Sequence, residues 1–159
     1  MYLTKDYFTR EPIRIQGIDN TTGNIETDYA IEMKNRMEQY AEIYEKRFLT
    51  AMLGPEYATL LSENASLKEL IFNQDTYTSP VANYVYYKLW EDSISENTMS
   101  GNKIVTADGS QVAINVAKMV NIWNLMRDMV IDILMETDVE GIVPDFSHEI
   151  FFDINSTGI

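Results

Sequence analysis

Residues 79–90 read SPVANYVYYKLW, and residues 118–126, beyond a polar interval, read KMVNIWNLM. Both stretches place apolar side chains at the three- and four-residue spacing of a helix. The Ser-Pro pair that opens the first stretch is a typical helix start, because serine caps a helix and proline is tolerated in its first turn. We therefore predict two helices, over 80–96 and about 111–137, joined as a hairpin.

The second of these helices has an unusually wide apolar surface. A second apolar stripe, through Ile122, Leu125 and Met129, accompanies its main one. A surface that wide indicates either a central helix or a helix that also faces a partner.

A third long helix is predicted upstream, from Thr27 or Asp28 to Gly54. Thr27 can cap its start, and Gly54 followed by Pro55 is a strong stop signal. Between these points the apolar residues recur every three or four positions, as one stripe does on a helix. That stripe consists of Met33, Met37, Tyr40, Tyr44, Phe48 and Ala51.

Two shorter helices are predicted next, over 56–62 and over 67–72, the second capped by Ser66. The fold class is therefore all-α. We expect a four-to-five-helix bundle with a projecting loop or short hairpin (about 97–110) and extended N- and C-terminal arms. The chain should form a single domain, 1–159, made of an N-terminal arm (1–25), a helical bundle (26–138) and an acidic, aromatic C-terminal tail (139–159).

Composition supports one globular domain. The chain has 159 residues, of which 45% are hydrophobic and 23% charged, and a chain of that size can bury a substantial core. No apolar run reaches the length of a membrane helix, and no secretory signal opens the chain, so we expect no membrane association. The chain has no cysteine, which excludes disulfides and cysteine metal sites.

The net charge is −13, and it is unevenly distributed. No lysine or arginine follows Arg127, whereas eight acidic residues do. An acidic C-terminal third disfavours binding to a phosphate backbone, so no sequence-specific nucleic acid is expected. It is compatible with a basic protein partner, and equally with a solvated acidic surface that keeps the chain soluble.

Residues that support catalysis are scarce. The only histidine is His148, so a two-histidine metal site cannot form within the chain. Phosphate-binding glycine patterns and a nucleophile elbow are absent. The many carboxylates are explained most simply as solvated helix faces. We predict no catalytic residue, no metal and no cofactor, and we expect that the protein is not an enzyme.

Two segments carry the candidate partner-binding residues. The interval between the last two long helices contains a short strand candidate followed by an Asp-Gly turn signal. The acidic tail contains four large apolar side chains, which could dock on a partner or could fold back over the bundle. The candidates are Ile104, Val105, Thr106, Asp108, Phe146, Ile150, Phe151 and Phe152.

These features together resemble the small α-helical head–tail connector proteins, also called adaptor or head-completion proteins, of tailed bacteriophages and prophages. The likeness covers about residues 1–130 and lies in the order and type of residues. It consists of the opening Met1-Tyr2-Leu3-Thr4 with Asp6 and Phe8, the helix end from Phe48-Leu49 to Leu53-Gly54, the stretch from Ser79 to Tyr87, the excursion around Gly101, and Lys118-Met119 through Trp123-Asn124 to Met126.

The resemblance implies a structural virion protein. Members of this family form a ring, commonly of twelve copies, beneath the portal protein, and receive the next neck or tail protein. The chain would then be monomeric alone, assemble in the host bacterial cytoplasm and end in the virion neck. The resemblance gives no counterpart for the residues after Val139. Two alternatives stay open, a dimeric cytoplasmic protein–protein interaction module of a bacterium and an enzyme with a carboxylate-based site.

Overall fold

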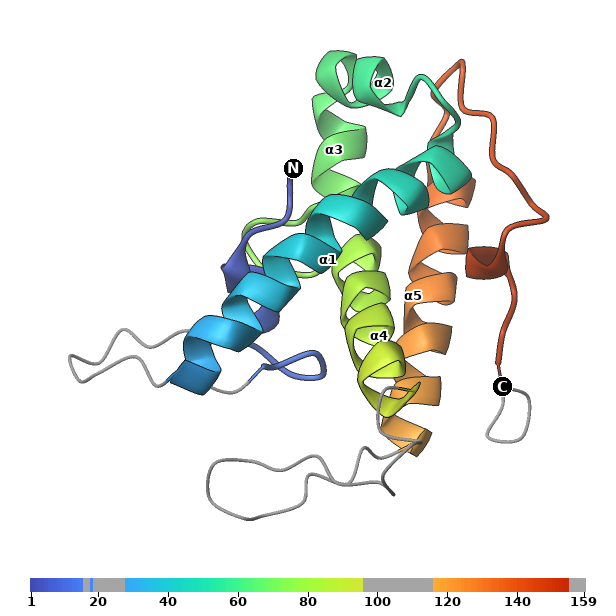
Figure 1. Cartoon of the computed structure of the whole chain (residues 1–159). Helices are drawn as coiled ribbons and strands as arrows, with labels where there is room; N and C mark the ends of the chain where they lie inside the picture. Colours follow the sequence, from blue (N-terminus) through green and yellow to red (C-terminus); the bar gives the residue numbers. More distant parts are fainter. Residues whose placement is uncertain (16–17, 19–27, 96–115, 155–159) are drawn as a thin grey trace.

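The computed structural model describes residues 1–15, 18, 28–95 and 116–154. These residues form five α-helices and two 3-10 helices (Figure 1), so the predicted all-α class is confirmed. Within these ranges no strand occurs, and the only extended pairing is an isolated bridge between Asn73 and Thr78. The predicted loop or hairpin at 97–110 lies outside the described residues.

Helix α4 (Pro80–Ser95) is the central element of the bundle. Ser79 Oγ accepts hydrogen bonds from the backbone N–H groups of Val81 at 3.2 Å and Ala82 at 3.4 Å, so the predicted cap is confirmed. Every residue from Val81 to Tyr87 is buried, because α1 packs on one side of α4 and α5 on another. Figure 1 shows α1 crossing in front of α4, with α5 beside it.

Helix α1 (Asp28–Leu53) ends where the sequence predicts, and Thr27, its predicted cap, lies outside the described residues. Its stripe points inward, with Met33, Met37 and Phe48 buried. The helix ends where Gly54 takes a φ of +96°, a conformation that a glycine adopts without strain. The Gly-Pro stop signal therefore acts through backbone geometry.

Helices α2 (Tyr57–Glu63) and α3 (Ala65–Ile71) follow with a single residue between them. The prediction that Ser66 caps the second of them is wrong, because α3 begins at Ala65 and Ser66 lies within its first turn. Asn64 occupies the cap position instead, and its side-chain amide donates to the carbonyl of Leu60 at 3.0 Å. The backbone leaves the helical conformation at Asn64, with φ of −119° and ψ of 89°, and α3 begins at the next residue.

Helix α5 (Val116–Glu136) completes the bundle. Its main stripe, which includes Trp123, Met126 and Val130, is buried against α4. The second stripe is only partly covered, since Ile122 is buried and Leu125 is 43% exposed. No described helix is both long enough and apolar enough to span a membrane.

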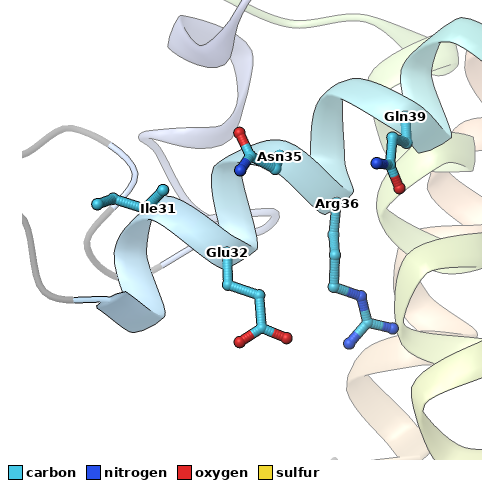
Figure 2. A pocket seen from close by; sticks show the side chains of 5 residues that line it. All are labelled: Ile31, Glu32, Asn35, Arg36 and Gln39. Atoms are coloured by element: carbon cyan, nitrogen blue, oxygen red, sulfur yellow. The ribbon is translucent and has the colours of Figure 1, made fainter.

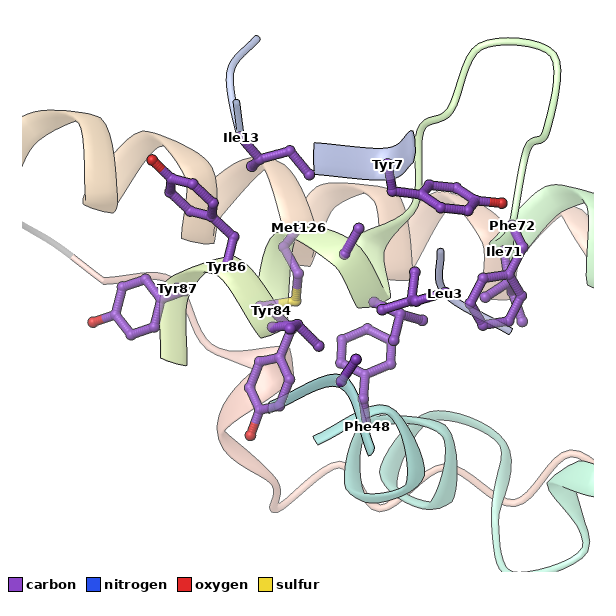
Figure 3. Packing of buried hydrophobic residues seen from close by; sticks show 14 of the residues in the cluster. Leu3, Tyr7, Ile13, Phe48, Ile71, Phe72, Tyr84, Tyr86, Tyr87 and Met126 are labelled. Atoms are coloured by element: carbon purple, nitrogen blue, oxygen red, sulfur yellow. The ribbon is translucent and has the colours of Figure 1, made fainter. Parts of the chain in front are cut away.

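Aromatic side chains join the three long helices into one core. The ring of Tyr84 lies 5.3 Å from that of Phe48 on α1 and 6.0 Å from that of Trp123 on α5, measured between centroids. Figure 3 shows Phe48, Tyr84 and Met126 converging from the three helices. Such tilted contacts are the arrangement that aromatic pairs favour.

The N-terminal arm, which the sequence predicts to be extended, contains no long helix. It carries the 3-10 helix η1 (Lys5–Phe8), and its apolar side chains enter the core, as Figure 3 shows for Leu3, Tyr7 and Ile13. The carboxylate of Glu45, only 6% exposed, accepts backbone hydrogen bonds of 2.9 Å from Tyr2 and Leu3. A buried carboxylate needs such donors, so Glu45 fixes the arm to α1.

Candidate interaction surface

The C-terminal tail folds back over the bundle as a strap, residues 142–154. It first meets the end of α1, where Val143 N–H donates to the carbonyl of Leu53 at 3.1 Å and Asp145 N–H to that of Ala51 at 2.8 Å. These carbonyls are among those that a helix end leaves without an internal partner. The strap approaches closely, since a Cβ on Gly54 would lie 3.2 Å from the Val143 carbonyl oxygen.

The strap then runs along α5, which holds it by its main chain. Trp123 Nε1 donates to the carbonyl of Phe152 at 2.7 Å. The Asn124 side chain makes two hydrogen bonds to Ile154, donating to its carbonyl at 3.1 Å and accepting from its N–H at 3.0 Å. Arg127 Nε donates to the carbonyl of Phe151 at 3.4 Å. Three α5 side chains therefore bind main-chain groups of residues 151–154.

A charged network joins the strap to α4. Lys88 Nζ lies 3.0 Å from Oε1 of Glu149 on the strap and 2.9 Å from Oε2 of Glu91 on its own helix. The Tyr84 hydroxyl donates to the same Glu149 oxygen at 2.7 Å. The Lys88 ammonium also lies 5.6–5.8 Å from the ring centroids of Tyr84, Tyr87 and Trp123, within cation–π range.

The ionisation of these groups follows from their surroundings. Burial alone would raise the pKa of Glu149, but the hydrogen bonds from Tyr84 and Lys88 and the charge of Lys88 outweigh it, so that pKa is lowered. Burial would lower the pKa of Lys88, yet its bonds to Glu91 and Glu149 raise it. Burial, followed by the bond to Glu149, raises the pKa of Tyr84 well above its ordinary value. Glu149 and Lys88 are therefore held charged.

The strap divides its apolar side chains between the core and the solvent. Ile150, in the 3-10 helix η3 (Glu149–Phe151), is fully buried, and Phe151 is half-buried. Ile150 therefore does not fit the prediction of a partner contact, because it serves as the anchor of the strap in its own core. Phe146 and Phe152 are 65% and 55% exposed, and Val143 is 66% exposed. These three remain available to a partner.

The remaining candidates, Ile104, Val105, Thr106 and Asp108, lie outside the described residues. Of the two possibilities that the sequence left open for the tail, the described part shows folding back, with exposed aromatic rings on its outer side. The rings of Phe146 and Phe151 lie 5.0 Å apart, so the exposed ring of Phe146 is supported by a half-buried neighbour.

The hollows of the described surface are shallow. One of them, about 630 Å³, lies between the strap and α1 and is lined by Ile43, Lys46, Val143 and His148 among others. Figure 2 shows a smaller one along the start of α1, where Glu32 and Arg36 project to the same side. Among the described residues no group of three or more acidic, histidine or cysteine side chains is placed to hold a metal ion.

The residues that secure the strap were not singled out by the sequence pattern. Lys88 stands alone among aromatic residues in the stretch from Tyr84 to Trp90, and Asn124 interrupts an apolar run. An isolated polar residue in an apolar surface is a signal, because a buried polar group needs a partner. The sequence does not show which residue pairs with Lys88, since Glu149 is one of many acidic residues.

Comparison of the chain with protein-family models, with curated proteins and with solved structures gives no match. We therefore infer function from the geometry above and from the residue pattern of the sequence.

Proposed function

We propose that the chain is a head–tail connector subunit of a tailed bacteriophage or prophage. In this role it forms a ring, commonly of twelve copies, on the portal protein and receives the next neck or tail protein. It assembles in the host cytoplasm and ends in the virion neck. It performs no catalysis.

The observation that supports this function is where the residues of the resemblance lie. Most of the apolar residues that carry the resemblance are buried in one core. They are Leu3, Phe8, Phe48, Leu49, Leu53, Val81, Tyr84, Val85, Tyr87, Trp123 and Met126. The residues on which the proposed likeness depends thus include much of the core of this bundle.

The surface suits a structural subunit. Phe146 and Phe152 are exposed on a strap that also carries Asp145 and Asp153. Large exposed aromatic rings are typical anchors of protein interfaces, and flanking carboxylates favour a partner with a basic rim. The net charge of −13 suits a channel through which DNA passes without being held.

Binding to the portal protein tests this function. The purified chain is mixed with the portal protein of the same phage, and the complex is analysed by sedimentation and electron microscopy. We expect a ring on the portal. The double variant Phe146→Ser with Phe152→Ser should bind at least tenfold more weakly. The matched control is Met135→Ser, which alters an 80% exposed residue of α5 outside the strap and should bind as wild type.

A dimeric cytoplasmic module is the alternative. Its natural interface would be the second stripe of α5, but Ile122 of that stripe is buried within the subunit and only Leu125 is substantially exposed. A stable dimer that does not bind the portal would favour this alternative over the connector.

A further inference from the structure

One side of α5 stays exposed in the described part of the chain. It carries four exposed residues, Leu125, Asp128, Asp132 and Glu136. Their spacing of three and four positions places them on the same side of the helix. We call this side, defined by these four residues, the α5 outer face. It is a helix face that neither α4 nor the strap covers.

A hollow opens at the Leu125 end of the α5 outer face. It has a volume of about 330 Å³ and lies between α5 and the N-terminal arm. Pro12, Ile122 and Leu125 give it apolar walls, and Leu125 is 43% exposed. Lys118 also lines the hollow, but its ammonium is already paired with Glu11 at 3.2 Å. The hollow therefore offers a place for an apolar side chain beside a row of carboxylates.

The carboxylates of the α5 outer face are placed unfavourably for the free chain. Asp128, Asp132 and Glu136 follow one another at intervals of four residues, at which like charges on a helix repel. Glu136 is also the last residue of α5, where the helix dipole disfavours an acid, and the last turn contains no basic residue. Asp128 is paired with Arg127 at 3.0 Å, but within the described ranges neither Asp132 nor Glu136 takes part in an ion pair. A cationic partner would relieve both effects.

The chemistry of the face selects the class of partner. Among the described residues no group of three or more acidic, histidine or cysteine side chains is placed to hold a metal ion, so the carboxylates do not form a metal site. Packing this face against the same face of a second copy would oppose like charges, which is unfavourable. A nucleic acid is repelled for the same reason. A protein segment that carries lysine or arginine beside a large apolar side chain matches both the carboxylates and the hollow.

We propose that the α5 outer face binds a basic segment of the next neck or tail protein. A large apolar side chain of the segment enters the hollow, and lysine or arginine side chains lie over Asp128 and Asp132. Leu125 and Asp132 are seven residues apart, about 10 Å along a helix, and this sets the distance between the apolar and basic side chains of the segment. The proposal rests on the proposed function, in which the subunit holds the portal protein by the exposed rings of the strap and needs a second surface for the next protein.

Neutralising the carboxylates tests this proposal. Wild-type and variant chains are assembled on the portal protein, and electron microscopy establishes whether each forms a ring. Binding of the purified next neck protein of the same phage to these rings is then measured by biolayer interferometry. The α5 variant is Asp128→Asn with Asp132→Asn and Glu136→Gln. The matched control removes three exposed charges from α1, from the residue before α2 and from the loop after α3, and is Glu32→Gln with Glu56→Gln and Asp75→Asn.

We expect the α5 variant to form rings and to bind the next protein about tenfold more weakly than wild type, because it lacks the charges that face the basic segment. Raising the NaCl concentration from about 50 mM to about 500 mM should weaken the binding of wild type more than that of the α5 variant, since salt screens exposed charge pairs. Leu125→Ser, which alters the apolar wall of the hollow, should also weaken binding about tenfold. The control variant should bind as wild type does.

Each contrary result has a separate meaning. Rings of the α5 variant that bind the next protein as tightly as wild-type rings would overturn the proposal and leave the connector function intact. Equal weakening by the α5 variant and the control variant would also overturn it, because net charge and not this face would then govern binding. Loss of the ring in the α5 variant alone would assign the face to ring contacts and overturn the choice of partner. Wild type that forms no ring on the portal would contradict the connector function itself, and the proposal with it.

Discussion

Tyr84 and Glu149 lie 65 residues apart in the chain, yet the hydroxyl of Tyr84 donates a hydrogen bond of 2.7 Å to Oε1 of Glu149. Lys88, one helical turn after Tyr84, reaches the same oxygen. Through this one carboxylate the C-terminal strap is tied to the central helix of the bundle. The contact therefore couples the position of the tail to the integrity of the core.

Replacing Glu149 should weaken the fold measurably. Glu149→Gln keeps an acceptor for Tyr84 but removes the charge that faces Lys88. We expect a loss of about 1 kcal/mol in the free energy of unfolding, a value limited by partial solvent screening of Glu149. Urea unfolding followed by Trp fluorescence measures it. Glu140→Gln, which changes an exposed tail carboxylate, is the control and should stay within about 0.5 kcal/mol of wild type. Equal effects of the two substitutions would show that the network contributes nothing.

The same carboxylate predicts a pH dependence. The pKa of Glu149 is lowered from the ordinary value of 4.5 in the folded chain, so the folded state favours the charged form. Its stabilisation is fully present above pH 4.5 and is lost as the pH falls through the folded-state pKa. The pKa of Asp145 is also lowered, by hydrogen bonds from Ser147, so the pH dependence of wild-type stability cannot be assigned to Glu149 alone. The difference in urea midpoint between wild type and Glu149→Gln reports the contribution of Glu149, and this difference should shrink between about pH 7 and about pH 3. A difference that stays constant over this range would contradict the account.

Removing the hydroxyl group should change the free energy of unfolding in opposite directions at two buried tyrosines. The Tyr7 hydroxyl is buried without a hydrogen-bond partner in the described part of the chain, and burial, more than the nearby Glu69, raises its pKa to about 12. Tyr7→Phe should raise the free energy of unfolding by up to about 1 kcal/mol, since an unsatisfied polar group is removed. Tyr84→Phe should lower it by about 1 kcal/mol, because the bond to Glu149 is lost. Thermal unfolding of both variants decides this, and a destabilised Tyr7→Phe would mean that its hydroxyl has a partner.

The strap side chains should separate into one that stabilises and two that bind. Ile150→Ala removes a fully buried side chain and should cost about 2–4 kcal/mol of stability. Phe146→Ala and Phe152→Ala alter exposed rings and should change stability by less than about 1 kcal/mol. Portal affinity, measured with the folded variants, should fall for the two Phe substitutions. If Phe146→Ala and Phe152→Ala both bind the portal as wild type does, the outer side of the strap is not the contact.

Much of the fold was predictable because its signals are local. Gly54 and Pro55 end α1, and Ser79 with Pro80 starts α4, where the sequence places them, since caps and stops act within a few residues. The choice of Ser66 as a cap failed for the opposite reason. The break between α2 and α3 falls at Asn64, where the backbone leaves the helical conformation, and serine at position 66 gives no local signal of where that break lies.

The contacts of the strap could not be predicted from local sequence rules. A tail with alternating acidic and apolar residues can project or fold back, and both patterns look the same in sequence. Whether the tail folds back depends on contacts between residues far apart in the chain. Ile150 is buried in the core, and Glu149 pairs with Lys88. Likewise, the burial of Glu45 depends on backbone donors of Tyr2 and Leu3 far along the chain, which a helical pattern on α1 cannot reveal.

The most direct test of the connector function is to look for the chain in virus particles. After induction of the strain that carries the gene, particles are purified by density and probed with an antibody against this protein, with the cell lysate as a reference. We predict a band in the particle fraction that persists through repeated purification. A chain that is present in the lysate and missing from pure particles would contradict the connector function and favour the cytoplasmic module.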